Sequence, residues 1–147
     1  MIYSKIIPWH SQEYQSALEL RQAVLRAPLG LSLYDEDLSK EKAYYHLGLF
    51  QDDRLIAILL LIPKDKTTLQ MRQVAVAENF QNKGIGRRLL AFAEKFAKTQ
   101  GFNHIVLNAR QSAVPFYKKQ GYHTVSEPFT ELGIPHLSME KMLDIYI

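Results

Sequence analysis

The sequence predicts an α+β fold built on a mixed, mostly antiparallel sheet of about six to seven strands with a central βαβ crossover. Apolar, β-branched runs joined by short polar turns fill residues 44–76 and predict antiparallel strands. An amphipathic helix over 84–100 leads directly into an apolar strand over 104–107, the pattern of a parallel crossover. A chain of 147 residues is long enough for one core, so we expect residues 1–147 to form a single domain.

The first third of the chain is expected to add one strand and one helix. Residues 1–7 alternate well enough for a short strand, which Pro8 ends. Ser11 then caps a helix over 13–26, where apolar positions recur at helical spacing. The acidic stretch 34–42 fits either a short helix or a loop, because its periodicity does not decide between them.

The elements after residue 43 are predicted from apolar segments and from glycines that end helices. Two prolines and a glycine without any sustained period predict a loop over 126–136. The remaining elements expected in order are strands over 44–50, 54–62 and 68–76, a helix over 84–100, a strand over 104–107, a helix over 112–120, and extended segments over 122–125 and 137–142.

Composition excludes several classes of protein. The chain has no cysteine, which rules out disulfides, thiolate metal sites and thiol nucleophiles. No histidine spacing suits a metal, so none is expected. The longest apolar run, Leu55–Pro63, is about half of what spans a bilayer, and residues 1–10 lack the pattern of a secretory signal. We therefore expect a cytoplasmic protein with no membrane partner.

Positive charge gathers at one point of the sequence. The net charge of +3 would suit a nucleic acid, a membrane surface or an anionic cofactor, and its magnitude alone does not choose among them, although we expect no nucleic-acid partner. Lys83, Arg87 and Arg88 cluster beside Gly84 and Gly86, whereas other basic residues are mixed with acids. This local charge favours a small anionic ligand.

The segment 74–90 combines a strand, a glycine-bearing loop and a long helix. The start of a helix leaves about four amides unpaired and carries roughly half a positive charge, so it stabilises an anion such as a pyrophosphate. Gly84 and Gly86 let the backbone approach such a ligand closely. The alternative is a plain helix entry with solvated basic residues. The spacings of a P-loop and of a dinucleotide fingerprint are both absent.

Two segments carry a family resemblance. Gln81-Asn82-Lys83-Gly84-Ile85-Gly86 resembles the Q/R-x-x-G-x-G/A pyrophosphate loop of the GNAT superfamily of acyl-CoA-dependent N-acyltransferases, and residues 113–122 resemble its A-x-x-[FL]-Y-x-x-x-G-[FY] segment. The resemblance implies an α/β three-layer type of fold with helices on both faces of the sheet. It implies an N-acetyltransferase that moves the acetyl group of acetyl-CoA to a primary amine, without a metal. The alternative is a non-catalytic acyl-CoA-binding sensor.

The resemblance also assigns roles to residues. Tyr117 would protonate the leaving thiolate, and a phenol with a reference pKa of about 10 is protonated at neutral pH. In the family, the strand ending near Val76 splays from its parallel neighbour and pairs with the pantetheine arm of the cofactor. The residues expected to bind the cofactor are Val74, Ala75, Val76, Gln81, Asn82, Lys83, Gly84, Ile85, Gly86, Arg87, Asn108 and Phe116.

The group that deprotonates the acceptor stays open at this point. His136 is the first candidate for the base, and Glu131 or water are the alternatives. Arg26 is a candidate for binding an acidic group of the acceptor. Arg110 replaces an asparagine common in the family, so it either binds a cofactor phosphate or is solvated. The acceptor is expected to be a small molecule or a peptide, and the family's frequent dimers allow a homodimer.

Overall fold

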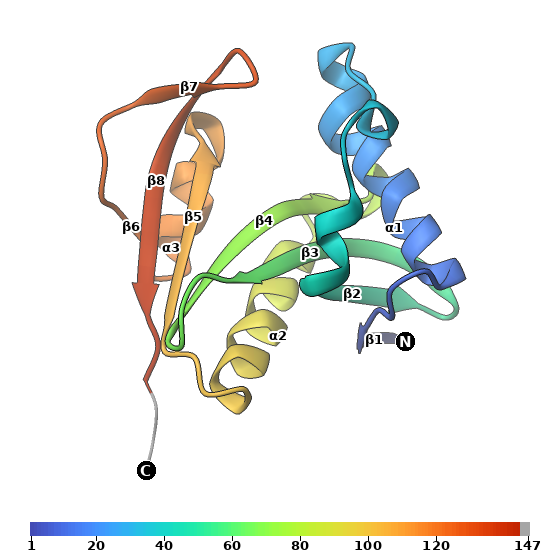
Figure 1. Ribbon diagram of the computed structural model, residues 1–147, viewed down its shortest axis with the longest axis horizontal. Helices are drawn as coiled ribbons and strands as arrows, with labels where there is room; N and C mark the ends of the chain where they lie inside the picture. Colours follow the sequence, from blue (N-terminus) through green and yellow to red (C-terminus); the bar gives the residue numbers. More distant parts are fainter. Residues whose placement is uncertain (145–147) are drawn as a thin grey trace. The chain divides into compact units, whose positions relative to one another are not determined.

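The computed structural model describes residues 1–144 (Figure 1). Its principal helices are α1 (Gln12–Arg21), α2 (Ile85–Thr99) and α3 (Val114–Lys119). Its strands are β1 (Ile2–Ile6), β2 (Tyr45–Gln51), β3 (Arg54–Pro63), β4 (Thr68–Val76), β5 (His104–Arg110), β6 (His123–Thr124), β7 (Phe129–Glu131) and β8 (Ile134–Met142).

The strands form one mixed sheet in the order β1-β2-β3-β4-β5-β8-β6, and β7 pairs with β8 outside this path. The predicted mixed, mostly antiparallel sheet is confirmed, with eight strands where six to seven were expected. The chain divides into two compact units, which are described in turn. The first unit holds Met1–Ile62 and Gln73–Ala93, and the second holds Pro63–Arg72 and the residues from Glu94 on.

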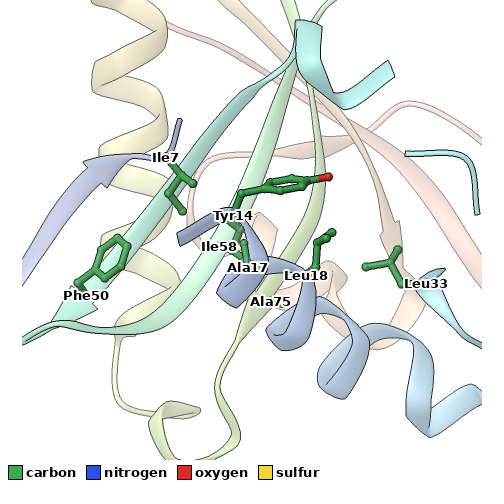
Figure 2. Packing of buried hydrophobic residues seen from close by; sticks show 8 residues of the cluster. All are labelled: Ile7, Tyr14, Ala17, Leu18, Leu33, Phe50, Ile58 and Ala75. Atoms are coloured by element: carbon green, nitrogen blue, oxygen red, sulfur yellow. The ribbon is translucent and has the colours of Figure 1, made fainter. Parts of the chain in front are cut away.

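In the first unit, β2 pairs antiparallel with both β1 and β3, as the apolar runs predict. The Ser11 hydroxyl accepts a hydrogen bond from the Tyr14 amide at 3.1 Å and so caps α1. Figure 2 shows the apolar side chains of α1 meeting those of the strands. This core cluster consists of Ile7, Tyr14, Ala17, Leu18, Leu33, Phe50, Ile58 and Ala75.

A buried ion pair lies beside this core. The Arg21 guanidinium donates two hydrogen bonds, of 2.8 and 2.7 Å, to the Glu41 carboxylate. Only 1% of Arg21 and 7% of Glu41 are exposed, so the two charges depend on each other. Tyr14 donates a further hydrogen bond of 2.9 Å to the same carboxylate, and His46 donates one of 2.7 Å to the Glu41 carbonyl. Glu41 therefore ties α1 to the segment that precedes β2.

The helix predicted over 13–26 is only partly correct. α1 ends at Arg21, and Gln22–Arg26 continues as a π-helix before a 3₁₀ turn over Ala27–Leu29. The Gln22 side chain explains where the chain turns back, because it donates to the Leu31 carbonyl at 3.1 Å and accepts from the Leu33 amide at 2.7 Å. These long-range contacts compete with a regular helix. The undecided stretch 34–42 contains 3₁₀ turns.

In the second unit, β4 pairs in parallel with β5 from Thr68 opposite His104 to Met71 opposite Leu107, which confirms the predicted crossover. β5 then pairs antiparallel with β8 over its whole length, from His104 to Arg110. Two residues of β6 flank the other side of β8. This unit therefore places β8 between β5 and the short strands β6 and β7.

The loop predicted over 126–136 is wrong, because most of it is a hairpin. β7 pairs with the first residues of β8, as seen at the hairpin tip in Figure 1. Leu132 and Gly133 make the two-residue turn with φ values of 52° and 75°, the left-handed pair of conformations that suits a tight hairpin. Leucine seldom adopts this conformation, and Pro128 and Pro135 further obscured the strands.

The buried ion pair predicts the behaviour of a charge-removing variant. Glu41→Gln keeps the shape of the side chain but leaves the Arg21 guanidinium without a counter-charge. Breaking a buried pair in this way costs about 3–5 kcal/mol, which we expect as a loss in the free energy of urea-induced unfolding. Glu13→Gln, which removes the exposed ion pair with Lys5, serves as the control and should cost at most about 1 kcal/mol. Equal losses in the two variants would contradict the prediction.

The same pair predicts a loss of stability in acid. Burial alone raises the pKa of Glu41, but the hydrogen bonds and charge of Arg21 outweigh it and leave this pKa below its ordinary value of 4.5. A lowered pKa means that the stabilisation is complete above the ordinary value and is lost as the pH falls below it. Unfolding measured through this range should show a smaller acid loss in Glu41→Gln than in the natural chain.

Candidate functional site

The loop that precedes α2 has a sharply turned backbone. Asn82 and Gly84 adopt left-handed conformations, with φ values of 62° and 78°. The Gln81 side chain closes the loop by donating a hydrogen bond of 2.9 Å to the Val76 carbonyl. The first helical bond runs from the Arg88 amide to the Gly84 carbonyl at 3.2 Å, so the amides before Arg88 lack helical partners. The loop thus presents unpaired donors at the positive end of a helix of 15 residues.

The cations of this loop differ in their surroundings. Lys83 and Arg87 are exposed, and within residues 1–144 neither forms an ion pair. The Arg87 guanidinium lies 3.7 Å from the point where a Cβ on Gly84 would stand, so its charge is close to the loop backbone. Arg88 is also exposed, but it reaches β1 and donates to the Ile2 carbonyl at 3.4 Å. Two exposed cations therefore add to the positive potential at the start of α2.

The last residues of β4 lead into this loop. Ala75 is buried in the core, while Val74 and Val76 are partly exposed. Just before them, Gln73 has a φ of 57°, which interrupts the extended backbone of the strand. The Gln73 Oε1 atom is buried and has no hydrogen-bond partner in the described part of the chain. Strain of this kind gathers at functional positions, and the strand-like alternation of residues 68–76 gave no sign of it.

Tyr117 occupies the last turn of α3. Gly121, with φ at 93°, ends this helix, and the Tyr122 amide bonds the Tyr117 carbonyl at 3.0 Å. This closure brings the two tyrosine rings to a centroid distance of 5.8 Å, and Phe116 packs on Tyr117 at 5.1 Å. Burial raises the pKa of Tyr117 to about 12. The phenol is therefore protonated at neutral pH. Within residues 1–144, it forms no hydrogen bond with another side chain.

The hairpin β7–β8 positions the histidine candidate. His136 lies opposite Phe129 in the strand pairing, and their rings stack with centroids 6.0 Å apart. Its Nδ1 donates to the Ile134 carbonyl at 2.8 Å, which leaves Nε2 directed toward the Glu131 carboxylate at 3.5 Å. His136 is thus in a strand and buried rather than in an open loop.

Arg110 and Asn108 lie on β5, on the face that His136 shares. The strand register places Arg110 directly opposite His136 and Asn108 opposite Ser138. The Ser138 hydroxyl donates to Asn108 Oδ1 at 2.9 Å. Asn108 is exposed, so its amide nitrogen faces solvent.

Arg26, the candidate for binding an acidic acceptor group, is already paired. Its Nε lies 2.6 Å from a Glu36 oxygen, and Nη2 lies 3.3 Å from the other oxygen of that carboxylate. Its remaining nitrogen donates to the Leu25 carbonyl at 3.3 Å, and the residue is buried. Arg26 therefore organises its own segment, and its charge is already neutralised by Glu36.

The predicted site residues fall in the two units. Val74, Ala75 and Val76 and the loop 81–87 are contiguous in the first unit. The second unit holds Phe116, Tyr117, Asn108 and His136. Across residues 1–144, no group of three or more acidic, histidine or cysteine side chains is placed to hold a metal ion. None of the helices in that range is long and apolar enough to cross a bilayer.

Comparisons with known proteins identify the family of the chain. The acetyltransferase (GNAT) domain family matches residues 24–143. The uncharacterised N-acetyltransferase YjcF of Bacillus subtilis (strain 168) is 28% identical over 137 residues, which cover 92% of this chain and 97% of that protein. The family match includes the loop and Tyr117.

Solved structures of other proteins have a similar fold. A candidate N-acetyltransferase from Lactobacillus plantarum superposes with a TM-score of 0.85 at 30% identity, covering 95% of this chain and 98% of that one. A GNAT family acetyltransferase from Elizabethkingia anophelis, solved with acetyl-CoA bound, superposes with a TM-score of 0.75 over 97% of this chain and 98% of that one, and at 22% identity it shows the fold alone. With the family match covering most of its length, the chain belongs to the GNAT acetyltransferases.

Proposed function

We propose that the protein binds acetyl-CoA and transfers the acetyl group to a primary amine by direct attack. The observation that carries this proposal is the loop before α2, where unpaired amides, a left-handed glycine and two exposed cations come together. Membership of the GNAT acetyltransferases and the acetyl-CoA bound to the Elizabethkingia anophelis protein support the same assignment.

The loop suits a diphosphate on chemical grounds. A phosphate oxygen accepts hydrogen bonds from amides, and the positive end of a helix stabilises its charge. A side chain at Gly84 would fill the space beside the Arg87 guanidinium, where we place the anion. Gln81, Asn82, Lys83, Ile85 and Gly86 complete the proposed loop.

The remaining contacts follow β4 and β5. We assign the pantetheine arm to the backbone of Val74, Ala75 and Val76, with Asn108 and Phe116 as further contacts. A backbone N–H at the end of β4 is the proposed donor to the thioester oxygen as negative charge develops there. Acetyl-CoA supplies the thioester carbon that the amine attacks.

Two side chains move protons in the proposed reaction. Tyr117 donates its phenolic proton to the leaving sulfur, and its raised pKa keeps that proton in place at neutral pH. His136 takes up the proton that the acceptor ammonium must lose, because its Nε2 carries the lone pair once Nδ1–H is bound to Ile134.

The loop assignment predicts the effect of an added carboxylate. In Gly84→Glu the side chain occupies the proposed phosphate position and repels the anion. We expect the Kd for acetyl-CoA, measured by calorimetry, to rise by about 10- to 100-fold, which corresponds to the loss of one charge-assisted hydrogen bond. Gly101→Glu, at a glycine of φ 90° at the other end of α2, imposes similar backbone strain and should leave the Kd unchanged. Unaltered binding in Gly84→Glu refutes the loop assignment.

The proton donor predicts a separation of binding from turnover. Tyr117→Phe should lower kcat by about 10²-fold in a thiol-release assay, because a positioned general acid contributes at least that much, while the Kd for acetyl-CoA stays the same. Tyr122→Phe is the control, since it removes a buried hydroxyl whose 3.1 Å hydrogen bond goes to Glu94. If acetyl-CoA binds but no amine is acetylated, the protein is a sensor instead.

The raised pKa of Tyr117 also predicts the alkaline limb of the pH profile. A proton donor works in its protonated form, which persists at pH values below the pKa of about 12. We therefore expect kcat to hold from about pH 8 to about pH 10.5. A fall of kcat centred on the value for free tyrosine, about 10, would contradict this prediction, and its persistence in Tyr117→Phe would point to another donor.

A further inference from the structure

The hairpin β7–β8 contains two groups able to accept a proton, and they differ in how far they reach solvent. The His136 side chain is only 5% exposed, whereas the Glu131 side chain is 41% exposed. A group that takes a proton directly from an acceptor must touch it. His136 lies beneath Phe129 and offers little surface to a ligand. Glu131 is the outer member of the pair.

We propose that Glu131 binds the ammonium of the acceptor and passes its proton inward to His136. This inference rests on the proposed function and assigns the two residues consecutive roles in it. Glu131 is then the catalytic residue that touches the acceptor, and His136 is the base that finally holds the proton.

The strand pairing sets up this relay. Phe129 and Glu131 are two residues apart on β7, so their side chains leave the same face of the hairpin. His136 faces Phe129 across the pair, which puts Glu131 on the diagonal with its Oε2 3.5 Å from Nε2. The bond from Nδ1 to the Ile134 carbonyl fixes the ring so that Nε2 points toward Glu131. One proton between the carboxylate and the imidazole would satisfy both groups.

The proton balance closes without another reactant. The acceptor ammonium gives a proton to a Glu131 oxygen, and the resulting carboxylic acid passes a proton to His136 Nε2. The free amine then forms its bond to the thioester carbon, the carbon–sulfur bond breaks, and Tyr117 protonates the sulfur. The second proton, which the nitrogen loses as the amide forms, returns to the Tyr117 phenolate, and the imidazolium of His136 releases its proton to solvent. The restored Glu131 carboxylate lies beside the imidazolium formed at His136. The carboxylate stabilises this cation.

The test compares Glu131→Gln with Glu127→Gln, which removes a charge from an exposed position just before the hairpin. The probes are spermidine, glucosamine and a peptide with a free N-terminus, each assayed by thiol release at saturating acetyl-CoA. We expect Glu131→Gln to lower kcat/KM by about 10²-fold near neutral pH. The deficit should shrink as the pH rises, because an amine that is already neutral needs no base. Glu127→Gln should match the natural chain.

His136→Gln provides a second measurement. Residues that act in one relay have non-additive effects, so the double variant should be no slower than the slower single variant. A deficit equal to the product of the two single effects overturns the relay, as does a Glu131→Gln variant within twofold of Glu127→Gln at every pH. If His136→Gln does not fold, the pH dependence of Glu131→Gln alone decides. A natural chain that acetylates none of the probes refutes the proposed function instead.

Discussion

The parallel pairing of β4 with β5 is the constraint from which the candidate site follows. Two parallel strands cannot be joined by a tight turn, so the chain must leave the end of β4 and cross back before β5 begins. Helix α2 makes that crossing, and its start therefore comes a short loop after Val76. A helix start close to the end of β4, where we propose that the anion binds, is a consequence of this connection rather than of any single residue.

The charges of the described residues divide by burial. Arg21 and Arg26 are buried, and each is neutralised by a carboxylate. Lys83 and Arg87 are exposed on the loop before α2 and form no ion pair within residues 1–144. A cation neutralised inside the protein contributes to folding, whereas one left in solvent is available to an anionic ligand. The net charge of +3 is modest, but exposed positive charge is concentrated at the loop before α2.

The proton transfers proposed for the second unit depend on how deeply Tyr117 and His136 are buried. The closing turn after α3 and the packing of Phe116 and Tyr122 bury the Tyr117 phenol, and burial keeps it protonated. The hairpin β7–β8 covers His136 with Phe129 and leaves Glu131 partly exposed. For both Tyr117 and His136, the proposed role depends on how deeply the neighbouring side chains bury the residue.

The sequence by itself determined the elements whose signals are local. The bounds of β4, the glycine ends of α2 and α3, the crossover and the basic glycine loop all follow from periodicity, capping and spacing within a few residues. Only the tertiary structure decided the rest. The pairing of Arg21 with Glu41, the π-helix over Gln22–Arg26 and the hairpin at 129–136 depend on contacts between distant segments, which override local preference. Exposure to solvent is likewise decided by the tertiary structure, which leaves the Glu131 side chain 41% exposed and the His136 side chain 5% exposed.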